Sequence, residues 1–133
     1  MADVLYDQES DAEFRSYLAK GEVRLQCCSQ CGRFRYPSRF ACPHCLSREW
    51  RWEAVSGQGV IETYLWYCQS VDPRFTEVPY NVALVRLAEG PGVFANIADA
   101  VLDDLKVGQL VTATIVTRDG RPRLSFVREN GPS

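Results

Sequence analysis

Four cysteines in the first third of the chain could hold a metal ion. Cys28 and Cys31 form one C-x-x-C pair, and Cys42 and Cys45 form a second pair after ten intervening residues. Two residues between cysteines allow a tight turn to direct both sulfurs to one point, and two such turns supply four thiolates in a tetrahedron. Zinc suits this geometry, and iron in a site of the same shape is the alternative.

Disulfide bonds would use the same cysteines only in an oxidising compartment. Residues 1–7 contain no basic region, no apolar run and no small-residue cleavage site, so we expect a cytoplasmic, reduced protein. A reduced setting favours a metal site over disulfides. Gly32 follows the first cysteine pair, where such a turn often needs the positive φ that glycine adopts at low cost.

The composition is that of an ordinary globular protein. The 133 residues are 46% apolar and 24% charged, and no apolar run reaches the length of a membrane span. A net charge of −2 and a pI near 5.4 oppose a nucleic-acid binder that depends on phosphate neutralisation. Residues 21–53 are nevertheless basic, with six arginines, no lysine and three glutamates.

A helix is expected over residues 11–20, before the cysteines. Ser10 fits its N-cap, Glu13 would complete a capping box, and Gly21 stands where the helix ends. One short helix needs to bury its apolar stripe, either on the rest of this chain or on another protein, and both alternatives stay open. The stripe consists of Phe14, Tyr17 and Leu18.

The segment around the cysteines predicts a zinc ribbon with little core of its own. Residues 23–26 and 46–53 alternate as short strands, and residues 33–37 follow the first cysteine turn. Trp50 and Trp52 fall on one side of the second strand. A unit of this size depends on its metal to stay folded.

The remaining chain predicts a small β-barrel. Its five expected strands cover residues 60–68, 80–87, 93–98, 110–117 and 123–127. Gly57 and Gly59 indicate a corner before the first strand, residues 72–79 a long loop, and Asp119-Gly120 a hairpin turn. Five strands with one long loop suit a Greek-key barrel such as the OB-fold. The fold class is therefore mainly β, with an N-terminal docking helix (1–21), a ribbon (22–53), a barrel (54–129) and a disordered tail (130–133).

The order of helix, four-cysteine ribbon and five-strand barrel resembles the DUF35 family, which consists of OB-fold proteins with a rubredoxin-like zinc ribbon. The resemblance covers nearly the whole chain. The motifs that carry it are Phe14 before Gly21, Cys28-x-x-Cys31-Gly32, Pro37-x-Arg39, Cys42-Pro43-x-Cys45, Ser56-Gly57-x-Gly59, Pro79-Tyr80-x-Val82-Ala83-Leu84-Val85, Glu89-Gly90 and Val107-Gly108.

The resemblance implies an accessory subunit. DUF35 proteins commonly partner thiolase-superfamily enzymes, including thiolases, acyltransferases and retro-aldolases that act on acyl-CoA, and some help to form a coenzyme A channel. The metal ligands carry over as Cys28, Cys31, Cys42 and Cys45. Cys27 departs from the family pattern and could replace Cys28 as a ligand, although the spacing favours Cys28.

No catalytic residue is expected in this chain. His44, the single histidine, lies inside the second cysteine turn, and a four-thiolate site leaves no open position for a substrate. Cys27 and Cys68 have no histidine arranged with them, and Cys68 alternates with aromatic residues as a packing residue would. Asp103-Asp104 are adjacent, which favours a solvated turn over a carboxylate pair.

Three functions remain open from the sequence. The first is the accessory subunit of a hetero-oligomeric acyl-CoA enzyme. The second is a stand-alone acyl-CoA-binding module, in which ribbon arginines contact the phosphates of coenzyme A. Those arginines are Arg33, Arg35, Arg39 and Arg48. The third is a nucleic-acid-binding barrel, which the acidic pI opposes.

Overall fold

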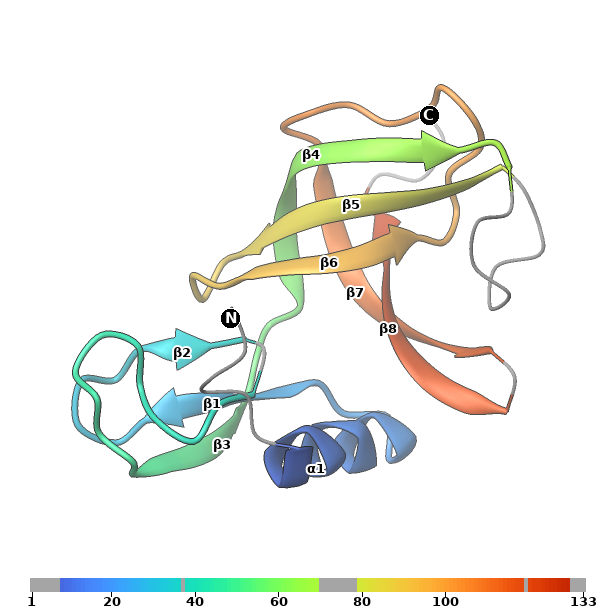
Figure 1. The fold of residues 1–133 in the computed structure, drawn as a ribbon. Coiled ribbons are helices and arrows are strands. Elements are labelled where there is room, and N and C mark those ends of the chain that lie inside the picture. The colour runs from blue at the N-terminus through green and yellow to red at the C-terminus, as the bar shows by residue number, and fades with distance from the viewer. Residues whose placement is uncertain (1–7, 37, 70–78, 119, 130–133) are drawn as a thin grey trace.

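The computed structural model describes residues 8–36, 38–69, 79–118 and 120–129, which form one helix, one three-stranded sheet and one closed barrel (Figure 1). Among these residues, no helix is long and apolar enough to cross a membrane. The elements are α1 (Gln8–Ala19), β1 (Arg24–Cys28), β2 (Phe34–Arg35), β3 (Trp50–Ala54), β4 (Gln58–Tyr67), β5 (Tyr80–Leu87), β6 (Gly92–Ile97), β7 (Leu110–Arg118) and β8 (Arg121–Arg128).

The C-terminus of α1 agrees with its expected end, and its N-terminus does not. Gly21 has φ +82°, its N–H donates to the carbonyl of Leu18, and the next N–H donates to the carbonyl of Tyr17. These two bonds form a Schellman motif. At the other end the helix already includes Gln8, so the prediction of Ser10 as N-cap is wrong. Ser10 and Glu13 both lie inside the helix, so Ser10 does not precede its first turn.

The apolar face of α1 is buried on its own chain. Phe14 and Leu18 are 5% and 4% exposed and belong to the core cluster. The ring of Phe14 meets Tyr36 edge-on at 5.5 Å, and Tyr17 lies 5.6 Å from Trp52. Of the two docking alternatives, the structure supports docking on the chain itself.

The three-stranded sheet of the ribbon has β1 at its centre, with β2 and β3 antiparallel on either side. The strand predicted over residues 46–53 begins only at Trp50. Leu46 instead has φ +64° and closes the second cysteine turn, so it cannot belong to an extended strand. Gln26 in β1 pairs with Arg35 on one side and Trp52 on the other.

The five predicted barrel strands are all present, and they close in the order β4-β5-β6-β8-β7. Closure requires one parallel pair, β6 with β8, which joins Asn96 to Ser125 and Ile97 to Phe126. The remaining pairs are antiparallel. This strand order is that of an OB-fold, so the predicted fold class is confirmed.

Two glycine signals in the barrel have a clear structural basis. Gly59 sits at a crowded crossing, where an added Cβ would lie 2.5 Å from Val85 Cγ1 and 3.0 Å from a backbone oxygen. Gly120 has φ +74°, and Arg118 pairs with Arg121 across the two-residue turn. The predicted hairpin at this turn is therefore confirmed.

Two expectations about barrel residues are wrong. Cys68 follows the last residue of β4 and is exposed, so it is not a packing residue. Asp104 does not sit in a purely solvated turn, because its carboxylate accepts from Nη1 of the buried Arg128. The expected loop at 72–79, apart from Pro79, and the expected tail at 130–133 lie outside the described residues.

Candidate metal centre

Two turns of nearly identical backbone geometry present the four cysteines. In the first turn the N–H of Gly32 donates to the carbonyl of Cys28 at 2.9 Å, and the N–H of Cys28 donates to the carbonyl of Arg33 at 2.9 Å. In the second turn the N–H of Leu46 donates to the carbonyl of Cys42 at 2.9 Å, and the N–H of Cys42 donates to the carbonyl of Ser47 at 2.8 Å. Both turns thus use the same two hydrogen bonds.

Each turn also ends on a residue with positive φ. Gly32 has φ +76° and Leu46 has φ +64°, and each directly follows the second cysteine of its pair. The first turn uses glycine, as the sequence predicts. The second turn holds leucine in the same conformation, which is unfavourable for a residue with a Cβ.

The four sulfurs fit one tetrahedral metal ion. The Sγ atoms of Cys28, Cys31, Cys42 and Cys45 all lie within 4.8 Å of one another. Cys28 Sγ is 3.6 Å from Cys45 Sγ, and Cys31 Sγ is 3.7 Å from Cys42 Sγ. A tetrahedron with metal–sulfur bonds of about 2.3 Å has sulfur–sulfur edges of about 3.8 Å. The donor set therefore matches the size and chemistry of a zinc or iron site.

Local hydrogen bonds prepare some of these thiols for ionisation. The backbone N–H of Cys31 is the largest influence in lowering the pKa of Cys28 to about 6. For Cys42, desolvation is the largest single influence and raises the pKa, but hydrogen bonds from the backbone N–H groups of Cys45 and His44 and from the neighbouring thiols together outweigh it, so the pKa of Cys42 is lowered. Cys45 shows the reverse: the backbone N–H of Ser47 lowers its pKa, but desolvation and the neighbouring sulfurs raise it to about 11. A bound cation would relieve this crowding of negative charge.

Cys27, the fifth cysteine of the segment, is not part of the sulfur cluster. Its side chain is buried, and its thiol donates to the carbonyl of Gly32 at 3.4 Å. Burial raises the pKa of this thiol. The structure thus favours Cys28 over Cys27 as the residue that faces the other three sulfurs.

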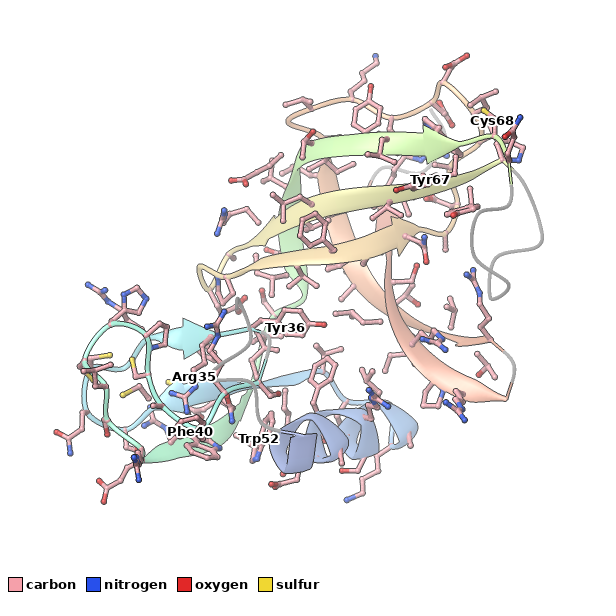
Figure 2. All side chains as sticks on the ribbon, viewed as in Figure 1. Arg35, Tyr36, Phe40, Trp52, Tyr67 and Cys68 are labelled. Carbon is pink, nitrogen blue, oxygen red and sulfur yellow. The ribbon has the colours of Figure 1, made fainter. Side chains whose placement is uncertain are left out.

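The other candidates from the sequence have separate places. His44 is exposed, and its Nδ1 lies 2.7 Å from Nη1 of Arg33, from which it accepts a hydrogen bond. Arg48 stacks over the ring of Phe40 at 5.6 Å. Cys68 lies at the end of the molecule opposite the ribbon (Figure 2).

A buried polar network beside the cluster was not predicted. Gln26 and Arg35 are 1% and 4% exposed. Oε1 of Gln26 accepts from Nε of Arg35 at 2.8 Å and from the N–H of Arg39 at 2.8 Å, while Arg35 Nη2 donates to the carbonyl of Arg39 at 3.2 Å. The guanidinium of Arg35 also lies over the ring of Trp50 at 4.9 Å. Desolvation lowers the pKa of Arg35, and the four cluster sulfurs oppose this, so Arg35 offsets part of their negative charge.

Comparison with protein families agrees with this geometry. Residues 15–51 match the family described as the rubredoxin-like zinc ribbon domain of ChsH2, and residues 52–116 match the C-terminal OB-fold domain of ChsH2. A DUF35 domain-containing scaffold protein from Methanocaldococcus jannaschii is 31% identical over 96 residues, which cover 70% of this chain and 68% of the relative. The chain belongs to the DUF35 family.

The chain is also similar to proteins whose names describe enzymes or enzyme subunits. A probable enoyl-CoA hydratase alpha subunit from Thermomonospora curvata is 32% identical over 108 residues, which cover 81% of this chain. The match spans only 34% of that relative's length. A chain from the solved structure described as Ltp2-ChsH2(DUF35) aldolase has a TM-score of 0.81 and 28% identity, covering 89% of this chain and 93% of the other.

A DUF35 ribbon with this arrangement can bind a metal but leaves it no reactive position. Four sulfurs complete a tetrahedral shell, so no place remains for a water or a substrate on the ion. The four clustered cysteines of a rubredoxin-like ribbon therefore indicate a structural metal.

Proposed function

We propose that this DUF35 protein is an accessory subunit, without catalytic residues of its own, of a thiolase-superfamily enzyme that acts on acyl-CoA. The observation that carries the proposal is the likeness to a chain of the Ltp2-ChsH2(DUF35) aldolase, which covers 89% of this chain and 93% of that one. The naming of relatives as scaffold proteins and as a subunit of an enoyl-CoA hydratase points in the same direction. In this role the chain stabilises its partner and contributes to the wall of the coenzyme A channel.

The arrangement of the reactive side chains supports a non-catalytic role. The Cys27 thiol is buried and donates to a backbone carbonyl, and the imidazole of His44 accepts from Arg33. The carboxylate of Asp104 forms an ion pair with the guanidinium of Arg128. A catalytic nucleophile needs a general base within hydrogen-bond reach. In the part of the chain that the structure describes, the Cys27 thiol is bonded to a backbone carbonyl and the His44 ring to a guanidinium, and the two are not bonded to each other.

The metal in this proposal is one zinc ion held by Cys28, Cys31, Cys42 and Cys45, in a structural role. The sulfur spacing and the closed shell support it, and iron fits the same four sulfurs. Elemental analysis of the purified chain, expected to give one zinc per chain and no visible absorption, distinguishes the two metals. A coloured preparation with one iron per chain would contradict the choice of zinc.

The accessory role is tested by co-expression with a thiolase-like chain from the same source organism. We expect the tagged DUF35 chain to bring the thiolase-like chain through affinity and size-exclusion columns at a fixed ratio. Cys42→Ser should abolish this co-purification, because it removes one sulfur from the cluster. Cys68→Ser is the matched control, since Cys68 is exposed and lies outside the cluster. The proposal fails if the thiolase-like chain never co-purifies, or if its yield and activity are the same without the DUF35 chain.

A further inference from the structure

The outer edge of β3 has no neighbouring strand among those that the structure describes. The sheet order is β2-β1-β3, so β3 pairs only with β1, over five consecutive residues and without a bulge. Figure 1 shows β3 on the side of the ribbon that faces away from the barrel. Edge strands in natural proteins are commonly blocked by a proline, a lysine or a bulge. β3 has none of these three features, so its edge is open to another strand.

The pairing with β1 identifies the backbone groups on this open edge. The carbonyl of Glu49 accepts from the N–H of Ser29 at 3.0 Å, just before β3. The N–H of Val55 donates to the carbonyl of Val23 at 3.2 Å, just after β3. Backbone groups alternate in direction along a strand, so every second residue between these two points away from β1. Within the described part of the chain, the N–H and C=O groups of these residues have no hydrogen-bond partner; they are Trp50, Trp52 and Ala54.

The rest of the chain fixes β3 in position. Nε1 of Trp52 donates to the carboxylate of Glu13 in α1 at 3.1 Å, and the Trp52 ring lies 5.6 Å from the ring of Tyr17. The guanidinium of Arg35 lies over the ring of Trp50 at 4.9 Å. A strand that is already ordered loses little conformational entropy when a second strand pairs with it. The open edge is therefore a prepared site for strand addition.

The side chains of β3 are complementary to a second copy of the same strand. Arg51 and Glu53 lie on the face opposite the two tryptophans, with side chains that are 51% and 42% exposed, and they are bonded to each other at 2.9 Å. In an antiparallel pair centred on Trp52, Arg51 of each copy stands directly opposite Glu53 of the other. Trp52 then stands opposite its own copy, and Trp50 opposite Ala54. These are three pairs of outward-facing residues, and each pair can exchange two backbone hydrogen bonds.

The charges of β3 also select one register for this pair. A shift by two residues in either direction keeps the outward backbone groups opposite one another. In one direction it places Arg51 opposite Arg51 of the second copy, and in the other direction Glu53 opposite Glu53. Like charges directly opposite each other destabilise a strand pair, whereas opposite charges stabilise it. This charge complementarity favours a second copy of the chain over a strand of unrelated sequence.

We propose that two copies of this chain associate through β3, antiparallel about a twofold axis at Trp52, so that their ribbons form one continuous sheet. Such a contact uses the same edge on both copies and therefore ends at a dimer. Because the barrel lies away from β3 (Figure 1), the two barrels stay at the outer ends of the pair. The association does not depend on the proposed enzyme partner, because every residue in it belongs to this chain.

Sedimentation equilibrium of the purified, metal-loaded full chain tests the proposal and should show a monomer–dimer equilibrium. Arg51→Glu and Glu53→Arg should each weaken association by about tenfold or more, because each variant places two like-charge pairs across the axis. An equimolar mixture of the two variants should restore the association of the unmodified chain, since every glutamate then faces an arginine. Lys106→Glu is the matched control: it reverses the charge of an exposed residue between β6 and β7 and should leave association unchanged.

Hydrogen exchange at low and high chain concentration locates the contact. The amides of Trp50, Trp52 and Ala54 should become protected only at high concentration, when the dimer forms. The amides of Arg51 and Glu53 should be protected at both concentrations, because they already face β1. The proposal is overturned if the chain stays monomeric at about 100 μM, if the mixture of charge variants stays monomeric, or if a dimer forms without protecting the edge amides. It is also overturned if these amides become protected only when a thiolase-like chain is added, because a strand of that partner would then occupy the edge.

Discussion

Replacing Leu46 by glycine should stabilise the protein, although leucine is the larger and more hydrophobic residue. Leu46 closes the second cysteine turn with φ +64°, and its side chain is 72% exposed. Its removal therefore costs little buried surface. The left-handed conformation costs a residue with a Cβ about 1–2 kcal/mol. Glycine avoids this cost but loses about 0.5–1 kcal/mol of unfolded-chain entropy. The net expectation is a gain of about 0.5–1 kcal/mol.

Gly32 supplies the reciprocal test, because it holds the equivalent position in the first turn. Its φ is +76°, and an added Cβ would meet nothing within 4 Å. Gly32→Ala should therefore lose about 1 kcal/mol through backbone strain alone, without a steric clash. The two variants should move stability in opposite directions by similar amounts.

Guanidinium unfolding at a fixed concentration of free zinc measures both changes, since a bound metal contributes to apparent stability through its concentration. The explanation from backbone strain is refuted if Leu46→Gly lowers the free energy of unfolding by more than about 0.5 kcal/mol, or if Gly32→Ala has no cost.

Three further predictions concern the helix, the barrel and the sulfurs. Phe14→Ala should lower the free energy of unfolding by about 3 kcal/mol, because this ring is 5% exposed in the core cluster. Gly59→Ala should cost about 2 kcal/mol, because the new Cβ would stand 2.5 Å from Val85 Cγ1. Metal affinity, measured by chelator competition, should rise at least tenfold per pH unit from pH 6.5 to 8. The Cys45 thiol, with its pKa raised to about 11, must release its proton to bind, whereas Cys28, with a pKa of about 6, is already ionised over most of this range.

Controls for these predictions come from the same chain. Val107→Ala truncates a side chain that is 67% exposed and should change stability by less than about 0.5 kcal/mol. A Phe14→Ala cost as small as this would mean that α1 is not docked on its own chain. Full native stability in Gly59→Ala would show that the crossing at Val85 is less crowded than described. A metal affinity independent of pH would contradict thiol deprotonation on binding.

Short-range patterns in the sequence predicted the cluster and the barrel well. The C-x-x-C spacing identified the four sulfurs that the structure brings together, and runs of β-branched and aromatic residues between turn signals located all five barrel strands. Gly21 and Gly120 end the helix and turn the last hairpin as expected, because the positive φ at these points favours a residue without a Cβ. Each of these features depends on residues close together in the chain.

Features that depend on distant residues were not predictable from the pattern. Cys68 alternates with aromatic residues, but β4 ends one residue earlier and leaves it exposed. The carboxylate of Asp104 forms an ion pair with Arg128, which belongs to the last strand. A pocket between the ribbon and the barrel is lined by ribbon residues and by the β5–β6 turn, which lies more than forty residues further along the chain. No local signal in either segment indicates that they meet.

The accessory role is tested most directly by titrating a purified thiolase-like partner with the metal-loaded DUF35 chain and following turnover of the partner's acyl-CoA substrate. We expect the rate to rise with added chain and to level off at a fixed molar ratio, and chain that has been unfolded by zinc chelation should give no rise. A partner whose rate is already maximal without the DUF35 chain would contradict the account, and so would equal activation by the metal-free chain.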